Sequence, residues 1–146
     1  MVSICKIINS LLDPLVSCGP ASKEQIHSAQ SQLGLLFPPS YIAFLQRYGA
    51  AFGNGVGIAG LAPDPMGEQP MWEDVVSSTL MYRSHNALPG DSIYISTDGA
   101  DHSYFLSCSK TNPDFEGKVI EWGPAHGGGT VYADSFISFV QRQVDR

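Results

Sequence analysis

The chain has 146 residues, a length that fits one domain with a sizeable core. Hydrophobic residues make up 43% and charged residues 15%, so the composition excludes a disordered protein, and no apolar run reaches the ~20 residues of a membrane span. The 15 glycines and 10 prolines place much of the chain in turns and exclude an all-helical bundle.

The net charge is -6, and the 8 Lys and Arg residues are scattered singly along the sequence. Nucleic-acid binding needs clustered cations that neutralise phosphates, so we expect no nucleic-acid partner. An acidic surface instead attracts a basic macromolecule, because opposite net charge speeds encounter. The alternative is that modest negative charge only keeps a small protein soluble.

The three cysteines, Cys5, Cys18 and Cys108, are odd in number and widely spaced. They do not predict a disulfide framework, so we expect three free thiols in a reducing compartment. The first residues lack the long apolar core and the small-residue cleavage site of a secretory signal. The sequence therefore predicts a cytoplasmic protein.

The first predicted element is an amphipathic helix over residues 4–15, limited by Pro14 and by the turn at residues 18–20. Its apolar stripe consists of Ile4, Ile7, Ile8, Leu11, Leu12 and Leu15.

Two further helices follow. Ser22 and Gln25 form a capping box that begins the second helix, and Gly34 ends it as a left-handed cap. Residues 37–40 form an extended connector to the third helix, which ends at Gly49. The buried faces are Ile26, Ala29 and Leu33 in the second helix and Tyr41, Phe44, Leu45 and Tyr48 in the third.

The glycine-rich, apolar residues 52–60 predict a short strand with bends, and residues 62–70 predict a loop. A helix is expected over residues 72–84, with Glu73 and Asp74 in its first turn, where carboxylates favour the positive end of the helix dipole. The residues that recur at helical spacing are Val75, Val76, Thr79, Leu80 and Arg83.

Residues 92–96 and 102–108 predict an antiparallel hairpin around a turn at residues 97–101, and residues 118–122 predict a third strand. After a loop over residues 124–129 we expect a closing helix whose face is Ala133, Phe136, Ile137, Val140 and Val144.

Helices first, strands in the middle and a helix last predict an α+β fold: a single domain over residues 1–146 with a mainly antiparallel sheet covered by amphipathic helices. We expect one shared core made of Phe44, Leu45, Ile93, Ile95, Phe105, Trp122, Phe136 and Val140.

The sequence contains no complete set of catalytic motifs. Residues 126–129 read His-Gly-Gly-Gly, as in the oxyanion loops of some esterases, but no G-x-S-x-G nucleophile elbow is present. The glycines at residues 53–60 are not followed by the lysine of a phosphate-binding loop. A small hydrolase is therefore the least favoured interpretation.

Metal and cofactor sites are not predicted either, because no His or Cys pair has the spacing of zinc ligands. Asp98, Asp101 and His102 lie close together in the predicted hairpin turn. Turns favour Asp for backbone reasons, so we assign these residues to turn formation ahead of catalysis or cation binding.

The ordered set of motifs resembles the SUKH superfamily, which includes bacterial toxin-immunity proteins and the fungal cell-wall-assembly regulators. The resemblance covers about residues 22–142, and its order and spacing are a signature of fold. The residues that carry it are Glu24, Ile26, Leu33 and Gly34; residues 37–41; Phe44, Leu45, Tyr48 and Gly49; Ile58, Gly60 and Leu61; Val75, Thr79, Arg83, Leu88 and Pro89; Ile93, Ile95, Asp98 and Gly99; residues 104–106; residues 117–119 and Trp122; and Ala133, Ser135, Phe136 and Phe139.

The chain departs from the family's usual pattern at Gln30, Asp101 and Ser107, where the family has an acidic residue, a glycine and an acidic residue. The resemblance implies a non-catalytic domain that binds another protein, in bacteria typically a toxin such as a nuclease, and neutralises it inside the producing cell. The second implied function is a regulatory scaffold of the cell-wall-assembly type.

The predicted partner is thus a cognate toxin, expected to be basic, and its contacts are expected in acidic, irregular segments because loops carry recognition. Trp72 either packs inward or anchors the partner. The candidate contact residues are Asp64, Glu68, Trp72, Glu73 and Asp74 in one region, and Asp98 and Asp101 at the hairpin turn.

Overall fold

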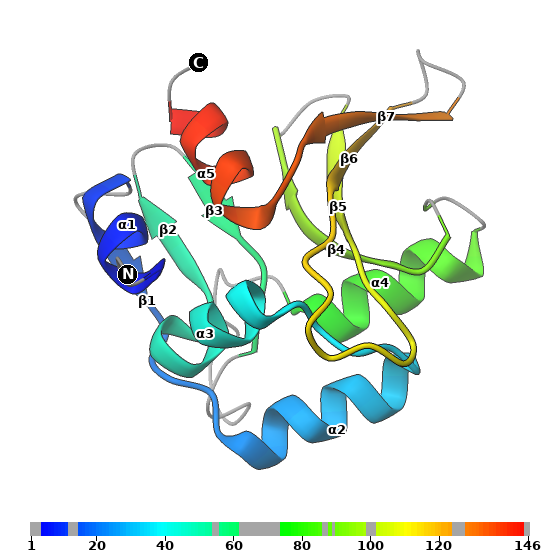
Figure 1. The fold of residues 1–146 in the computed structure, drawn as a ribbon, viewed down its shortest axis with the longest axis horizontal. Helices are drawn as coiled ribbons and strands as arrows, with labels where there is room; N and C mark the ends of the chain where they lie inside the picture. Colours follow the sequence, from blue (N-terminus) through cyan, green and yellow to red (C-terminus); the bar gives the residue numbers. More distant parts are fainter. Residues whose placement is uncertain are drawn as a thin grey trace.

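The structure is a computed structural model that describes residues 4–11, 15–53, 56–61, 74–85, 88, 90–98, 102–123 and 128–144 (Figure 1). Its helices are α1 (Ile4–Leu11), α2 (Lys23–Leu33), α3 (Pro39–Tyr48), α4 (Val75–Ser84) and α5 (Phe136–Val144). Its strands are β1 (Leu15–Ser17), β2 (Ala51–Gly53), β3 (Val56–Ile58), β4 (Ser92–Thr97), β5 (Ser103–Ser107), β6 (Val119–Gly123) and β7 (Gly128–Ala133).

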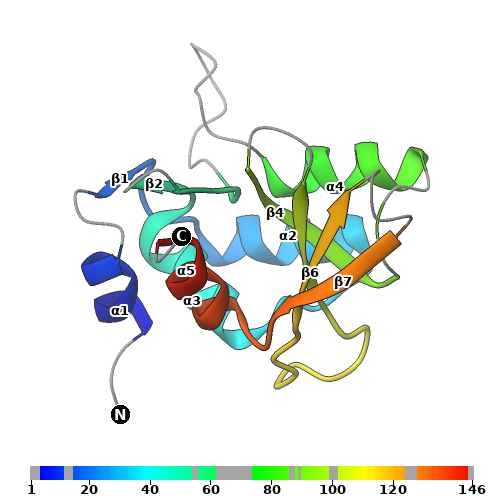
Figure 2. The ribbon, with the colours of Figure 1, turned by 90° about the horizontal axis from the view of Figure 1, so that it is seen from above.

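The strands form two antiparallel sheets, one in the order β1-β2-β3 and one in the order β4-β5-β6-β7. The helices α3 and α5 lie between the two sheets, and α4 runs alongside β4 (Figure 2). This arrangement confirms the predicted α+β class. None of the described helices has the length and apolar character required to cross a membrane.

Local sequence signals explain α2 and α3. The Ser22 hydroxyl accepts a hydrogen bond from the Gln25 N–H, the Gln25 side chain accepts one from the Ser22 N–H, and Gly34 ends α2 at a φ of 69°. The predicted capping box and left-handed cap are therefore confirmed. The connector before α3 is shorter than predicted, because Pro39 already occupies the first helical position, which tolerates a missing N–H.

The N-terminal helix is also shorter than predicted. It ends at Leu11, and Leu15 opens β1 instead of completing the helical stripe. Leu15 lies opposite Gly53 of β2, so pairing with a distant strand determines its conformation. The predicted single strand over residues 52–60 is two short strands, β2 and β3, which pair with each other.

The largest difference from the sequence expectation lies near the C-terminus. The described residues 128 and 129 of the predicted loop, together with Ala133 of the predicted helix, belong to the strand β7, and α5 begins only at Phe136. The glycines at residues 127–129 predict a loop, yet Gly129 is required by packing in the sheet. A Cβ atom there would lie 2.5 Å from Ile120 Cγ2 and 2.9 Å from Trp122 Cε3.

The predicted single core is divided over two clusters. The main cluster, which joins α3 and α5 to the sheet, contains the predicted residues Phe44, Leu45, Ile93, Ile95, Phe136 and Val140. Phe105 belongs to a second cluster with Tyr94 and Ala59, on which Trp122 packs while only half-buried. Successive side chains of a strand point to opposite faces, so Phe105 and Leu106 cannot share one core.

The outer edge of β4 is covered by hydrogen bonds from other elements. The Tyr94 N–H donates to the Thr79 Oγ1 of α4 at 3.0 Å, and the Ala59 N–H donates to the Ile95 carbonyl at 2.8 Å. These bonds attach α4 and the end of β3 to the four-stranded sheet. They fix the position at which α4 faces α2.

Candidate functional site

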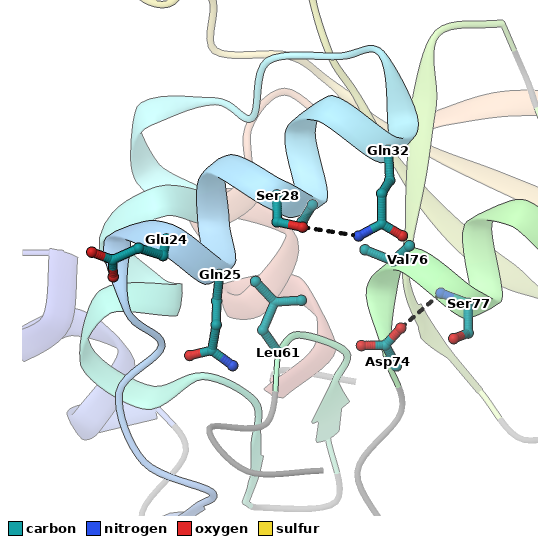
Figure 3. A pocket seen from close by; sticks show the side chains of 9 residues that line it. Glu24, Gln25, Ser28, Gln32, Leu61, Asp74, Val76 and Ser77 are labelled. Atoms are coloured by element: carbon teal, nitrogen blue, oxygen red, sulfur yellow. Dashed lines mark hydrogen bonds between the residues drawn. The ribbon is translucent and has the colours of Figure 1, made fainter.

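A groove of about 450 Å³ lies between α2 and α4, within the size range of ligand pockets (Figure 3). Three parts of the chain that are distant in sequence form its surface. The lining residues are Glu24, Gln25, Ser28, Ala29 and Gln32 from α2, Leu61 after β3, and Asp74, Val76 and Ser77 at the start of α4.

The α2 wall of the groove is polar and mostly uncharged. Gln25, Ser28 and Gln32 are spaced three and four residues apart, which places them on one face of the helix. The Gln32 Nε2 donates a hydrogen bond to the Ser28 Oγ at 3.1 Å. Amides and hydroxyls of this kind both donate and accept hydrogen bonds, as peptide groups do.

The α4 wall begins with Asp74, which is the N-cap of the helix. Its Oδ2 accepts a hydrogen bond from the Ser77 N–H at 2.7 Å, and the adjacent positive end of the helix dipole favours its charge. The sequence pattern predicts Asp74 within the first turn of this helix. In the structure Asp74 lies just before that turn, as the N-cap.

Backbone contacts hold the two ends of the groove floor together. Gly60 and Asp74 form a parallel bridge, and the Val75 N–H donates to the Gly60 carbonyl at 2.9 Å. Leu61 and Val76 are both buried, 7% and 8% exposed, so the floor is apolar. The groove thus combines an apolar floor with hydrogen-bonding walls.

The charge of the groove is negative. Glu24 and Asp74 contribute carboxylates, and none of the described lining residues is Lys, Arg or His. The Glu24 carboxylate points away from the side chain of Asp74, so the two charges lie at separate places (Figure 3). This distribution favours a cationic ligand and disfavours an anionic one.

The predicted contact residues are only partly covered by the structure. Asp74 lines the groove, whereas Asp98 does not. Asp98 Oδ2 lies 3.0 Å from His102 Nδ1, and Asp98 Oδ1 accepts from the His102 N–H at 3.2 Å, which supports its assignment to turn formation. Predicted contacts that lie outside the described residues are Asp64, Glu68, Trp72, Glu73 and Asp101.

Sequence reasoning missed most of the groove lining. The spacing of Gln25, Ser28 and Gln32 was visible as a polar stripe, but any solvated helix face has such a stripe. Leu61 entered only as part of the family resemblance, and Ser77 carried no signal of its own. Only the position of α4 beside α2 shows that these residues share a surface.

The two described thiols are free and have raised pKa values. Burial raises the pKa of Cys108 to about 12. Burial also raises the pKa of Cys18, whose Sγ lies 3.5 Å from the Tyr48 carbonyl oxygen. Neither is a thiolate nucleophile at neutral pH. Among the described residues, no three His, Cys, Asp or Glu side chains gather as a set of metal ligands.

The chain matches a known protein family. The SUKH_5 family model, described as SMI1-KNR4 cell-wall, matches residues 4–145. The match covers nearly the whole chain and extends beyond both ends of the resemblance inferred from the sequence motifs. The chain therefore belongs to the SUKH superfamily, within its SMI1-KNR4 cell-wall family.

Proposed function

We propose that this protein is a non-catalytic immunity factor that binds a cognate, basic bacterial toxin and neutralises it by direct contact in the cytoplasm. The observation that carries the proposal is the groove between α2 and α4. Its walls form hydrogen bonds, and its described lining includes two carboxylates and no basic residue. The net charge of -6 also favours a positively charged partner. Membership of the SUKH superfamily, which includes immunity proteins, supports the class of function.

A regulatory scaffold is the second candidate, and the cell-wall description of the matched family favours it. Such a scaffold would also use the groove for protein binding. The two candidates differ in whether a toxin is silenced. Growth of a cell that makes the toxin therefore discriminates between them.

The test requires a neighbouring gene that encodes a toxic domain, and it uses that domain. We expect a cell that produces the domain alone to stop growing, and co-production of this protein to restore growth through a stable complex. A complex that leaves the toxin active, or the absence of a complex, would contradict the immunity function and leave the scaffold as the remaining candidate.

The acidic contacts are tested by changing Glu68, Glu73 and Asp74 to Gln, Gln and Asn. Asparagine is also a good N-cap, so α4 should keep its start and the thermal midpoint should stay nearly unchanged. We expect weaker toxin binding and a flatter dependence of affinity on salt, because exposed carboxylates act through long-range attraction.

The matched control changes Asp91, Asp114 and Asp134 to Asn, which removes the same charge from described positions that do not line the groove. Affinity is measured at low and high salt for both variants. If the two variants behave alike, only net charge attracts the toxin and the proposed contacts are wrong.

A further inference from the structure

The apolar surface next to the groove extends the possible contact area. Leu80 and Met81 are 41% and 51% exposed, although both are large hydrophobic side chains. They lie one helical turn beyond Val76 and Ser77, which line the groove. The groove and this apolar patch are therefore consecutive along α4.

The groove walls present both donors and acceptors of hydrogen bonds. The Gln32 Nε2 donates a hydrogen bond to Ser28. Among the described residues, the Gln32 Oε1 and the Ser77 Oγ have no protein partner. A carbonyl oxygen and a hydroxyl at the two walls match the N–H and C=O groups of an extended peptide. Asp74 adds a negative charge beside them, which matches a lysine or arginine side chain.

We propose that the groove between α2 and α4 binds an extended segment of the partner protein that carries a basic residue over Asp74 and an apolar residue over Leu80 and Met81. This inference rests on the proposed function for the identity of the partner, but its chemistry comes from the groove itself. A second copy of this chain is a poorer occupant, since the net charge of -6 makes two copies repel each other.

The structure also sets the spacing within the bound segment. Asp74 and Met81 are separated by seven residues at the start of a helix, which is about 10 Å at 1.5 Å per residue. An extended chain covers that length in about three residues at ~3.3 Å each. The bound segment therefore has its basic and apolar residues three positions apart.

The test uses a synthetic peptide in place of the unidentified partner. The probe is a ten-residue Gly-Ser peptide with one arginine and one leucine three positions later, added to isotope-labelled protein. We expect amide signals of Gln25, Ser28, Ser77 and Leu80 to shift at millimolar peptide. A peptide with glutamate in place of arginine, and one with arginine and leucine adjacent, should bind more weakly.

Two variants and two matched controls locate the contacts. Asp74→Asn should lower affinity about fivefold, the size of a partly screened ion pair, whereas Asp114→Asn removes the same charge elsewhere and should not. Met81→Ser should lower affinity, whereas Val16→Ser, at an equally exposed position on β1, should not.

Three results would overturn the inference: no shifts with the arginine peptide, equal effects of the variants and their controls, or shifts on dilution alone, which would assign the groove to a second copy. The toxin assay tests the proposed function separately. Peptide binding without protection from the toxin would retain this inference and remove the proposed function. Protection that survives Asp74→Asn and Met81→Ser would retain the proposed function and remove this inference.

Discussion

Burial controls the chemistry of individual side chains in this protein, as Cys108 shows. Its side chain is 7% exposed, and its pKa is raised from 9.0 to about 12 by loss of hydration. Above pH 9 the unfolded chain releases the thiol proton while the folded chain retains it. The free energy of unfolding therefore falls as pH rises from 9 toward 12.

This linkage gives a prediction for Cys108→Ala. Between pH 9 and 10 the variant should lose about 1 kcal/mol less stability than the wild type, because it has no buried thiol to keep protonated. Burial also raises the pKa of Tyr41 well above its ordinary value of 10.0, so this phenol lowers stability mainly above pH 10, and it is present in both proteins. Urea unfolding at pH 8, 9 and 10 measures the difference, and parallel curves for both proteins would contradict it.

Gln30 shows how a single residue can depart from a family pattern and keep a structural role. Its Oε1 accepts a hydrogen bond from the Phe37 N–H at 2.8 Å, which links α2 to the segment before α3. A carboxylate at this position could accept the same bond. The departure noted in the sequence therefore leaves this contact available.

At the scale of elements, the sequence predicted what is decided locally. The start of α2 depends on Ser22 and Gln25, three residues apart, and this local signal predicts it correctly. Leu15 and β7 depend on strands far away in the chain, and there the local pattern failed. Helical spacing of apolar residues cannot exclude a strand when a partner strand supplies the hydrogen bonds.

The docking of α5 on the sheet can be tested with Phe136→Ala. Phe136 is fully buried and makes edge-on contacts with Tyr41 and Phe44 at ring distances of 5.4 and 5.6 Å. Removing the ring should cost about 3 to 5 kcal/mol of stability, through lost burial and a residual cavity. Urea unfolding should show a lower midpoint, while Val131→Ala at an exposed strand position should change it by less than about 0.5 kcal/mol. An unchanged midpoint for Phe136→Ala would mean that α5 is not docked.

At the scale of the whole molecule, residues 59–61 connect the two sheets and the start of α4. A Cβ on Gly60 would lie 1.6 Å from the Gly49 carbonyl oxygen, so the two backbones cross at a distance only glycine permits. The Leu61 N–H donates to that same oxygen at 2.9 Å. The groove also depends on assembly of the whole molecule, since the sequence predicted both Asp74 and α2 but not that the two face each other.

This crossing predicts that Gly60→Ala destabilises the molecule as one unit. Far-ultraviolet circular dichroism and tryptophan fluorescence should show the same lowered midpoint, because both sheets depend on residues 59–61. Gly57→Ala is the control, since a Cβ there makes only ordinary contact, 3.4 Å from a Phe52 ring atom. Separate transitions for the two probes would show that the sheets unfold independently.

The bridge between Gly60 and Asp74 also has an evolutionary consequence. It fixes both ends of residues 62–73, the part of the chain that holds Asp64, Glu68, Trp72 and Glu73. Lengthening a closed loop costs little, about 0.6 kcal/mol for each doubling. Descendants of one ancestral gene could therefore exchange this stretch for another of different length and composition while inheriting the same fold. Selection for the choice of binding partner would then act separately from selection for the fold.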